Sequence, residues 1–281
     1  MKINTAKEKM LEGEPAFGYS AKLGSHVAAE FLGHSGVDFV LLDGQHGSWG
    51  QDSMIQGVTA VCTTPAMPFA RVIYNFFPLI GQLLDAGIMG IVSPMVNTAD
   101  DARAFARACR LPPVGERSWG SARAAAYGDD YMDWINDQLF VAVQIETVQA
   151  VENAEAIMAV PGIDGCMIGP ADLACSMGFH PREAARRQDH ARMLERVILA
   201  CRNTGKIPGI DTGASESVVK RVEQGFIFIP MGSDVKFMRT GAVAEVKLAK
   251  QAAEKLRAND GSSGTGLDGS TWRASAEPGQ P

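Results

Sequence analysis

The sequence lacks the features that mark several classes of protein. Basic residues are in the minority, with 26 Lys and Arg against 32 Asp and Glu, and no basic run is interleaved with aromatic residues. This balance disfavours a nucleic-acid or anionic-membrane partner. The longest apolar stretches are too short for a membrane span, and residues 1–15 lack the apolar core of a signal peptide. We therefore expect a cytoplasmic protein with no membrane or nucleic-acid partner.

The cysteines and histidines also lack a recognisable pattern. The five cysteines lie far apart without a C-x-x-C pair, which fits reduced thiols better than disulfides or a zinc knuckle. No His and Cys cluster has the spacing of zinc ligands, so a closed structural zinc site is not expected. No glycine-rich phosphate-binding signature is complete either. With 46% hydrophobic and 21% charged residues, the composition is that of an ordinary globular protein.

What the sequence does contain is a regular alternation of short apolar runs and helical segments. Most runs are near-continuous, as in strands that are covered on both faces. Eight such repeats in about 250 residues match an α/β fold of the (β/α)8 TIM-barrel type, whereas a doubly wound sheet would not need them. The predicted strands are residues 16–20, 37–43, 69–73, 88–93, 139–145, 163–168, 206–210 and 226–230. The predicted helices are 25–34, 53–63, 76–85, 99–110, 148–160, 182–204, 215–223 and 234–256.

Two segments depart from this alternation. Residues 111–138 form a long connection, and such excursions are usually functional or lid-like. Residues 259–281 are rich in Gly, Ser and Pro and are predicted to be disordered. The sequence therefore predicts one barrel domain over residues 1–258, followed by a tail.

Two carboxylates follow neighbouring predicted strands. Glu146 comes directly after the run 139–145, and Asp172 follows the run 163–168. In a β/α barrel the site lies at the C-terminal ends of the strands. Two carboxylates there, with waters and a chelating substrate, suit Mg²⁺, Mn²⁺ or Co²⁺. Each acid can equally cap the helix that follows it, and position alone leaves both interpretations open.

Three further polar residues lie at predicted strand ends. Arg71 lies near the end of the third strand, where a guanidinium can bind a substrate oxygen or form an ion pair with a barrel acid. His46 lies in a glycine-flanked loop, three residues after Asp43. An Asp–His pair suits a general base near neutral pH, whereas a lone surface histidine is the alternative.

Several stretches together resemble one family. VDFVLLDGQHG, FARV, QLLDAG, PPVGERSWG and the combination QIET…GIDG…IGPADL are similar to the HpcH/HpaI aldolases, which are metal-dependent class II pyruvate aldolases. The resemblance runs over roughly residues 14–250 in the family's own order. It implies a TIM barrel of the phosphoenolpyruvate/pyruvate-binding type. It also implies a homohexamer, a trimer of dimers, in which C-terminal helices are exchanged between subunits.

The resemblance assigns roles to individual residues. It implies that Glu146 and Asp172 bind a divalent metal ion, Mg²⁺, Mn²⁺ or Co²⁺. Arg71 would bind the pyruvate oxygen and stabilise the enolate, and His46 with Asp43 would form the base. Six positions would bind substrate: Gln144, Gly169, Pro170, Ala171, Asp85 and Trp119. Of these, Asp85 would reach the site of a neighbouring subunit, and Trp119 would shape the acceptor pocket.

The reaction implied is retro-aldol cleavage of a 4-hydroxy-2-oxo acid into pyruvate, or a close 2-oxo acid, and an aldehyde. A Schiff base is not expected, because Lys206 lies at the N-terminal end of its strand and no other lysine is seen to end one. An oxaloacetate-type decarboxylase or a CoA-thioester lyase is the alternative, and a non-catalytic barrel is a third. Many family members have Glu where this chain has Gln45, so the aldehyde preference is open.

Overall fold

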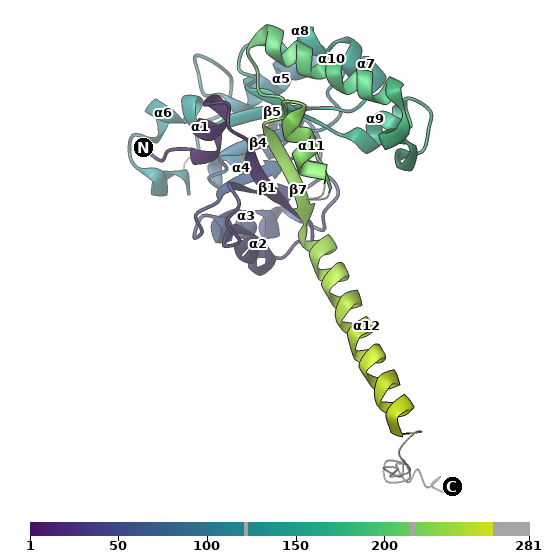
Figure 1. Cartoon of the computed structure of the whole chain (residues 1–281). Helices are drawn as coiled ribbons and strands as arrows, with labels where there is room; N and C mark the ends of the chain where they lie inside the picture. The colour runs from purple at the N-terminus through teal and green to yellow at the C-terminus, as the bar shows by residue number, and fades with distance from the viewer. Residues whose placement is uncertain (121–122, 214–216, 261–281) are drawn as a thin grey trace, which may run out of the picture. The chain divides into compact units, whose positions relative to one another are not determined.

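A computed structural model describes residues 1–120, 123–213 and 217–260 of the chain (Figure 1). The chain divides into two compact units, Met1–Lys236 and Phe237–Pro281. Helix α12 (Asp234–Asp260) begins in the first unit and continues in the second. The predicted tail lies outside the described residues from position 261 onwards. Among the described helices, none has the length and apolar character needed to cross a membrane.

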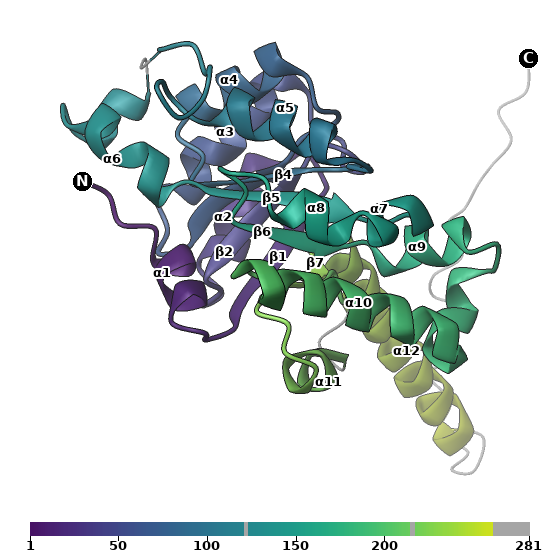
Figure 2. The same cartoon turned by 90° about the horizontal axis from the view of Figure 1, so that it is seen from above.

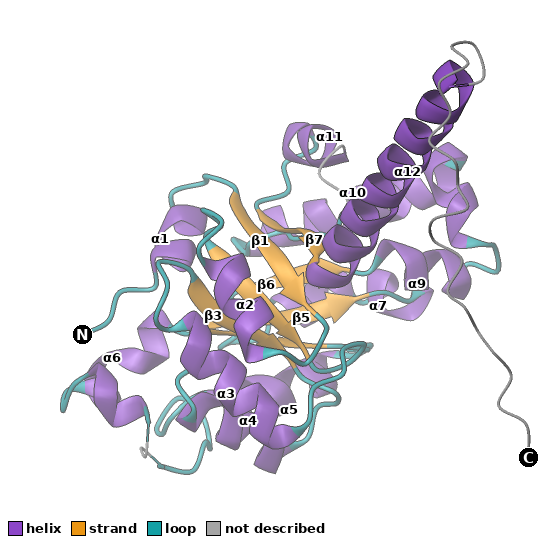
Figure 3. Ribbon diagram, turned by 90° about the horizontal axis from the view of Figure 1, so that it is seen from below, coloured by secondary structure: helices purple, strands orange, loops and turns teal. Residues whose placement is uncertain are grey.

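Seven parallel strands form one sheet in the first unit, with helices around it (Figure 3). Their order in the sheet is β6-β5-β4-β3-β2-β1-β7, so strands adjacent in sequence are adjacent in space from β1 to β6. This arrangement is that of a TIM-barrel-like α/β fold. The strands are β1 (Ala16–Ala21), β2 (Phe39–Asp43), β3 (Met67–Arg71), β4 (Gly90–Ser93), β5 (Phe140–Ile145), β6 (Gly165–Ile168) and β7 (Phe228–Ser233).

The predicted strand 206–210 occupies the gap between β6 and β7 but is not a regular strand. Ile207 and Ile210 form isolated parallel bridges with β6, and Gly209 forms one with Phe228 of β7. Backbone hydrogen bonds on both sides join the two edges of the sheet through this segment. Pro208 has no N–H to donate, which accounts for the interrupted pairing. The prediction of eight strand positions is therefore right in order, but one position is irregular.

The helices follow the predicted segments with some differences. The predicted helix 148–160 is wrong as a single element, because it breaks at Asn153, whose side chain donates to the carbonyl of Asn97. α8 and α10 lie side by side beyond β6 (Figure 2). Helices α1, α6 and α9 were not expected. The helices before α12 are α1 (Thr5–Leu11), α2 (His26–Gly33), α3 (Gln51–Val61), α4 (Phe77–Asp85), α5 (Ala99–Cys109), α6 (Tyr131–Gln138), α7 (Val148–Glu152), α8 (Ala154–Met158), α9 (Pro170–Ser176), α10 (Gln188–Thr204) and α11 (Val218–Glu223), with 3-10 turns at Ala124–Tyr127 and Pro181–Arg186.

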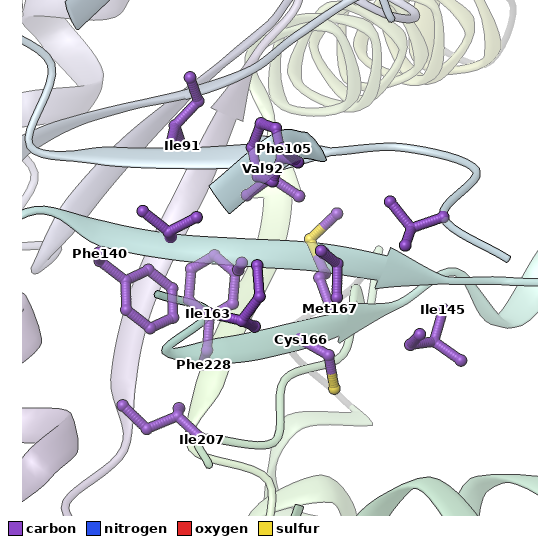
Figure 4. Packing of buried hydrophobic residues seen from close by; sticks show 14 of the residues in the cluster. Ile91, Val92, Phe105, Phe140, Ile145, Ile163, Cys166, Met167, Ile207 and Phe228 are labelled. Atoms are coloured by element: carbon purple, nitrogen blue, oxygen red, sulfur yellow. The ribbon is translucent and has the colours of Figure 1, made fainter. Parts of the chain in front are cut away.

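A cluster of phenylalanine rings fills the interior of the sheet. The rings of Phe39 and Phe69 stack with centroids 4.9 Å apart. Phe140 meets Phe228 edge-on, with centroids 5.1 Å apart (Figure 4). Gly90 makes room for this cluster, since a Cβ there would lie 2.5 Å from the ring of Phe69. Such close packing fixes the strands that carry the polar residues at their C-terminal ends.

Helix α1 lies at the N-terminal end of the sheet, where its Lys7 belongs to a buried cluster of charged side chains. Lys7 Nζ lies 3.2 Å from Asp164 Oδ1, and Arg110 Nη2 lies 2.7 Å from Asp164 Oδ2. Burial lowers the pKa of Lys7, and the charge of Asp164 opposes that shift. One carboxylate therefore forms ion pairs with two largely buried cations.

We expect Asp164→Asn to lower the free energy of unfolding by about 2 to 3 kcal/mol, because both cations lose their counter-charge. Urea denaturation measures this change. Asp100→Asn is the matched control, since Asp100 pairs with Arg103 on the surface and should cost less than about 1 kcal/mol. Equal losses in the two variants would contradict the prediction.

Candidate active site

A row of hydrogen-bonded polar side chains crosses the C-terminal end of the sheet. Arg71, at the end of β3, donates to both carboxylate oxygens of Asp43, at the end of β2, at 2.9 and 2.5 Å. Its Nη1 donates to Gln144 Oε1 of β5 at 3.1 Å. Gln144 in turn donates through Nε2 to Glu146. All four side chains are buried, so three strands hold one preorganised polar network.

Besides Gln144, backbone groups of two further segments hold Glu146 in place. The backbone N–H of Met95 donates to its Oε1 at 2.8 Å, and Met95 has φ +55°, a left-handed conformation that is strained for this residue type. Gly169 approaches so closely that a Cβ there would lie 2.5 Å from Glu146 Oε2. The carboxylate therefore has a fixed position in which only a small group fits beside it.

Asp172 lies near Glu146, on the first turn of α9. Burial raises the pKa of Glu146, and the charge of Asp172 raises it further, against the hydrogen bond from Met95. The cap interpretation fails for Glu146, because Thr147 is the residue whose side chain caps α7. Asp172 makes no side-chain cap hydrogen bond at α9 either. In the part of the chain that the structure describes, no third His, Cys, Asp or Glu completes a metal-binding group around them.

Most of the predicted residues line a common cleft of about 400 Å³. Arg71 and Gln144 line it, together with the backbone segment 169–171 and Asp172. His46, an exposed residue, lines the same cleft. The remaining lining residues are Lys22, Asp211, Thr212 and Gly213. The structure thus brings Asp172, Arg71 and His46 to one cleft, and Glu146 is hydrogen-bonded to Gln144, which also lines it.

The predicted contact between Asp43 and the His46 imidazole is not what the structure has. The Asp43 carboxylate accepts hydrogen bonds from Arg71 and from the backbone N–H of His46, at 3.1 Å, rather than from the imidazole. Burial alone would raise the pKa of Asp43, but the hydrogen bonds and charge of Arg71, with the charge of Lys22, hold it below the ordinary value. The ion-pair interpretation of Arg71, left open on the sequence, is therefore confirmed.

Asp85 and Trp119 are not brought to the cleft of their own chain. Asp85 is the last residue of α4, at the N-terminal end of the sheet, where its carboxylate accepts a hydrogen bond from Arg117 at 2.8 Å. Arg117 also donates to the hydroxyl of Tyr131, and the Tyr131 ring lies 6.0 Å from that of Trp119. The described parts of this connection, residues 111–120 and 123–138, thus pack at the end of the fold opposite to Glu146 and not over the cleft of their own chain.

The chain matches a known family over most of its length. The family model described as HpcH/HpaI aldolase/citrate lyase matches residues 20–240. The chain belongs to this family. The sequence-based resemblance to the HpcH/HpaI aldolases is therefore confirmed, and the protein is a carbon–carbon lyase that acts on small molecules.

Relatives of this HpcH/HpaI protein carry aldolase names. The 4-hydroxy-2-oxo-heptane-1,7-dioate aldolase of Salmonella dublin is 37% identical over 262 residues, which cover 90% of this chain and 96% of its own. The Escherichia coli protein of the same name is 38% identical over 251 residues, or 86% and 93% of the two chains. A crystal structure of an HpcH/HpaI aldolase/citrate lyase family protein from Burkholderia cenocepacia matches with a TM-score of 0.79 and 31% identity, covering 90% and 99%.

One polar residue of this HpcH/HpaI site was missed on the sequence. Lys22 directly follows β1, so the expectation that no lysine besides Lys206 lies at a strand end is wrong. Its Nζ lies 3.3 Å from Asp43 Oδ2, and its side chain lines the cleft. The strand was predicted to end at residue 20, which left the position after Ala21 out of consideration. A boundary error of one residue thus concealed a lysine in the site.

Proposed function

We propose that the protein catalyses metal-dependent retro-aldol cleavage of a 4-hydroxy-2-oxo acid to pyruvate, or a close 2-oxo acid, and an aldehyde. The observation that carries this proposal is the buried row Asp43–Arg71–Gln144–Glu146. It links a fixed guanidinium, which lines one cleft with Asp172, to the Glu146 carboxylate, which lies near Asp172. A guanidinium and a carboxylate pair together suit a substrate whose ketone oxygen gains negative charge.

Glu146 and Asp172 are the residues that would hold the divalent ion, Mg²⁺, Mn²⁺ or Co²⁺. Burial raises the pKa of Glu146, and the charge of Asp172 raises it further; a bound cation would offset both effects. Their oxygens are the ligands that these ions prefer, and waters and the substrate would complete the shell. When bound, the ion supplies Lewis-acid polarisation of the 2-oxo group.

The protein's own residues account for the remaining steps. Arg71 donates to the ketone oxygen of the substrate, and Asp43 holds the guanidinium in place for that contact. His46 takes the proton of the C4 hydroxyl, directly or through water, as the C3–C4 bond breaks into an aldehyde and pyruvate enolate. Protonation at C3 then gives pyruvate. Backbone groups of the segment 169–171 bind the carboxylate of the 2-oxo acid.

We propose further that the active form is a hexamer built as a trimer of dimers, in the cytoplasm, with one barrel domain over residues 1–258. In the assembly, Asp85 and Trp119 would serve the cleft of a neighbouring subunit. Asp85 lies at the opposite end from its own cleft and is partly exposed, which supports this arrangement. Helix α12 carries exposed Met238, Val243 and Val246, which would be covered on exchange between subunits.

Exchange of the C3 protons of pyruvate with solvent deuterium tests the proposal. We expect exchange with Mn²⁺ or Mg²⁺ and none after EDTA, because the enolate forms only with both Arg71 and the ion in place. NMR follows the methyl signal, and a parallel incubation compares 4-hydroxy-2-oxo acids with oxaloacetate. Undiminished exchange in EDTA would refute the metal role. Decarboxylation of oxaloacetate without aldol cleavage would favour the decarboxylase alternative, and exchange only with CoA thioesters would favour a CoA lyase.

A further inference from the structure

Lys22 brings a second cation to the cleft beside Arg71. Its side chain leaves the end of β1 and reaches Asp43, where Nζ lies 3.3 Å from Oδ2. The same oxygen accepts a hydrogen bond from Arg71 Nη2 at 2.5 Å. Because both nitrogens contact the same oxygen, the distance between them is at most the sum of these two N–O distances.

The backbone of Lys22 is held in place on both sides. Asp234 accepts hydrogen bonds from the backbone N–H of Lys22, at 2.9 and 3.0 Å, and from that of Leu23. The carbonyl of Lys22 accepts from the N–H of Ser48, at 2.8 Å, in the loop that carries His46. This contact needs a glycine at position 24, with φ +68°, since a Cβ there would lie 2.4 Å from Ser48 O. Residues 22–24 and the loop that carries His46 therefore hold each other in a fixed position.

The charges around Asp43 leave an excess of positive charge at Lys22. Arg71 takes both carboxylate oxygens of Asp43 and is almost fully buried, whereas the Lys22 side chain is 28% exposed. One carboxylate cannot neutralise two cations. The other acids that line the cleft are Asp172, assigned above to the metal ion, and Asp211, whose Oδ1 accepts a hydrogen bond from Gly213 N. The partly exposed ammonium of Lys22 can therefore form a second ion pair, with an anionic group of a substrate.

We propose that Lys22 is a specificity-determining residue that binds a carboxylate on the acceptor half of the substrate. This inference rests on the proposed function, in which Arg71 binds the oxygen on C2. C4 is separated from C2 by a single carbon, so a carboxylate attached to C4 falls beside Arg71, where the ammonium of Lys22 lies. The acceptor carbonyl compound would then be an oxo acid, with its carboxylate next to the reacting carbonyl.

Two acceptors of similar size test this assignment. Glyoxylate carries a carboxylate next to its aldehyde, and glycolaldehyde carries an uncharged hydroxymethyl group in its place. We expect the ratio of kcat/KM for glyoxylate over glycolaldehyde, with pyruvate as donor, to fall between about 10-fold and 100-fold in Lys22→Met, mainly through KM for glyoxylate. Lys22→Arg should restore most of the ratio, and Lys220→Met, on the exposed face of α11, should not change it. An unchanged ratio in Lys22→Met would refute the assignment.

Two further measurements separate this inference from its alternatives. Deuterium exchange of pyruvate reads only the donor half, so its absence in the unaltered enzyme would refute the proposed function, whereas normal exchange with an unchanged ratio would refute the role of Lys22 alone. Treatment with pyruvate and borohydride tests for an imine, which would form by loss of water between the amine and the ketone. We expect no added mass on Lys22, because it acts as a charged contact. An adduct that forms in the unaltered protein but not in Lys22→Met would overturn that role.

Discussion

Replacing Glu146 with Gln is expected to lower kcat/KM at least about 1,000-fold and to abolish tight binding of Mn²⁺. The substitution keeps the size of the side chain and an oxygen that can accept from Met95 N. It removes the negative charge that, with Asp172, would hold a divalent ion. The loss should therefore arise from missing electrostatics rather than from altered packing.

Electron paramagnetic resonance of free Mn²⁺ measures the binding, and pyruvate release measures the activity. Glu152→Gln is the matched control, since Glu152 is an exposed carboxylate on α7, six residues further along the chain. This variant should keep both the Mn²⁺ affinity and the activity within about twofold of the values of the unaltered protein, because exposed charges contribute little. Retention of Mn²⁺ affinity in Glu146→Gln would place the metal elsewhere.

The positions of the site acids were predictable, because they depend only on strand order. Near-continuous apolar runs predicted buried parallel strands, and such strands direct their last residues to one end of the sheet. Glu146, Asp172 and Arg71 therefore lie close together, as expected. The irregular strand at 207–210 shows the limit of this approach, since Pro208 interrupts pairing without changing the apolar pattern.

The partners of each side chain were not predictable in the same way. Asp43 and His46 are three residues apart, yet the carboxylate bonds to Arg71, from the next strand. A buried carboxylate forms its strongest interaction with a cation that is equally excluded from water, and sequence distance does not reveal which cation that is. Lys22 was missed for a related reason. β1 ends at Ala21, one residue later than predicted, and the sequence does not fix the end of a strand to within one residue.

The location of Trp119 and Asp85 depended on how a loop folds back. A long connection between β4 and β5 can cover either end of the sheet, and its length alone favoured a lid. In the structure Arg117 is fully buried and bonds to Asp85, which ties the connection to the N-terminal end. A buried arginine within a polar loop marks such an anchor, but the sequence does not say where its acid lies.

Arg71→Met is expected to reduce kcat/KM about 1,000-fold and to lower the free energy of unfolding by about 3 kcal/mol. The activity falls because the ketone oxygen loses its donor. The stability falls because Asp43, which is fully buried, keeps only Lys22 as a counter-charge. Breaking a buried pair on one side is costly for this reason.

Acid pH should narrow the difference in the free energy of unfolding between the unaltered protein and Arg71→Met. Arg71 and Lys22 hold the pKa of Asp43 below its ordinary value, so the stabilisation is complete above that ordinary value and is lost as the pH falls through the folded-state pKa. Unfolding by urea at about pH 7 and about pH 3 measures the change. A gap between the unaltered protein and Arg71→Met that stays constant over this range would contradict the assignment to Asp43.

The double variant Arg71→Met/Asp43→Asn separates the two effects of the arginine. An amide at position 43 needs no counter-charge and still accepts from the backbone N–H of His46, so about 2 kcal/mol of stability should return. Activity should stay low, because no guanidinium faces the substrate. Arg103→Met, from an exposed ion pair on α5, is the control and should change neither quantity appreciably. If the double variant were as unstable as Arg71→Met, the loss would come from packing of the arginine stem rather than from an uncompensated buried charge.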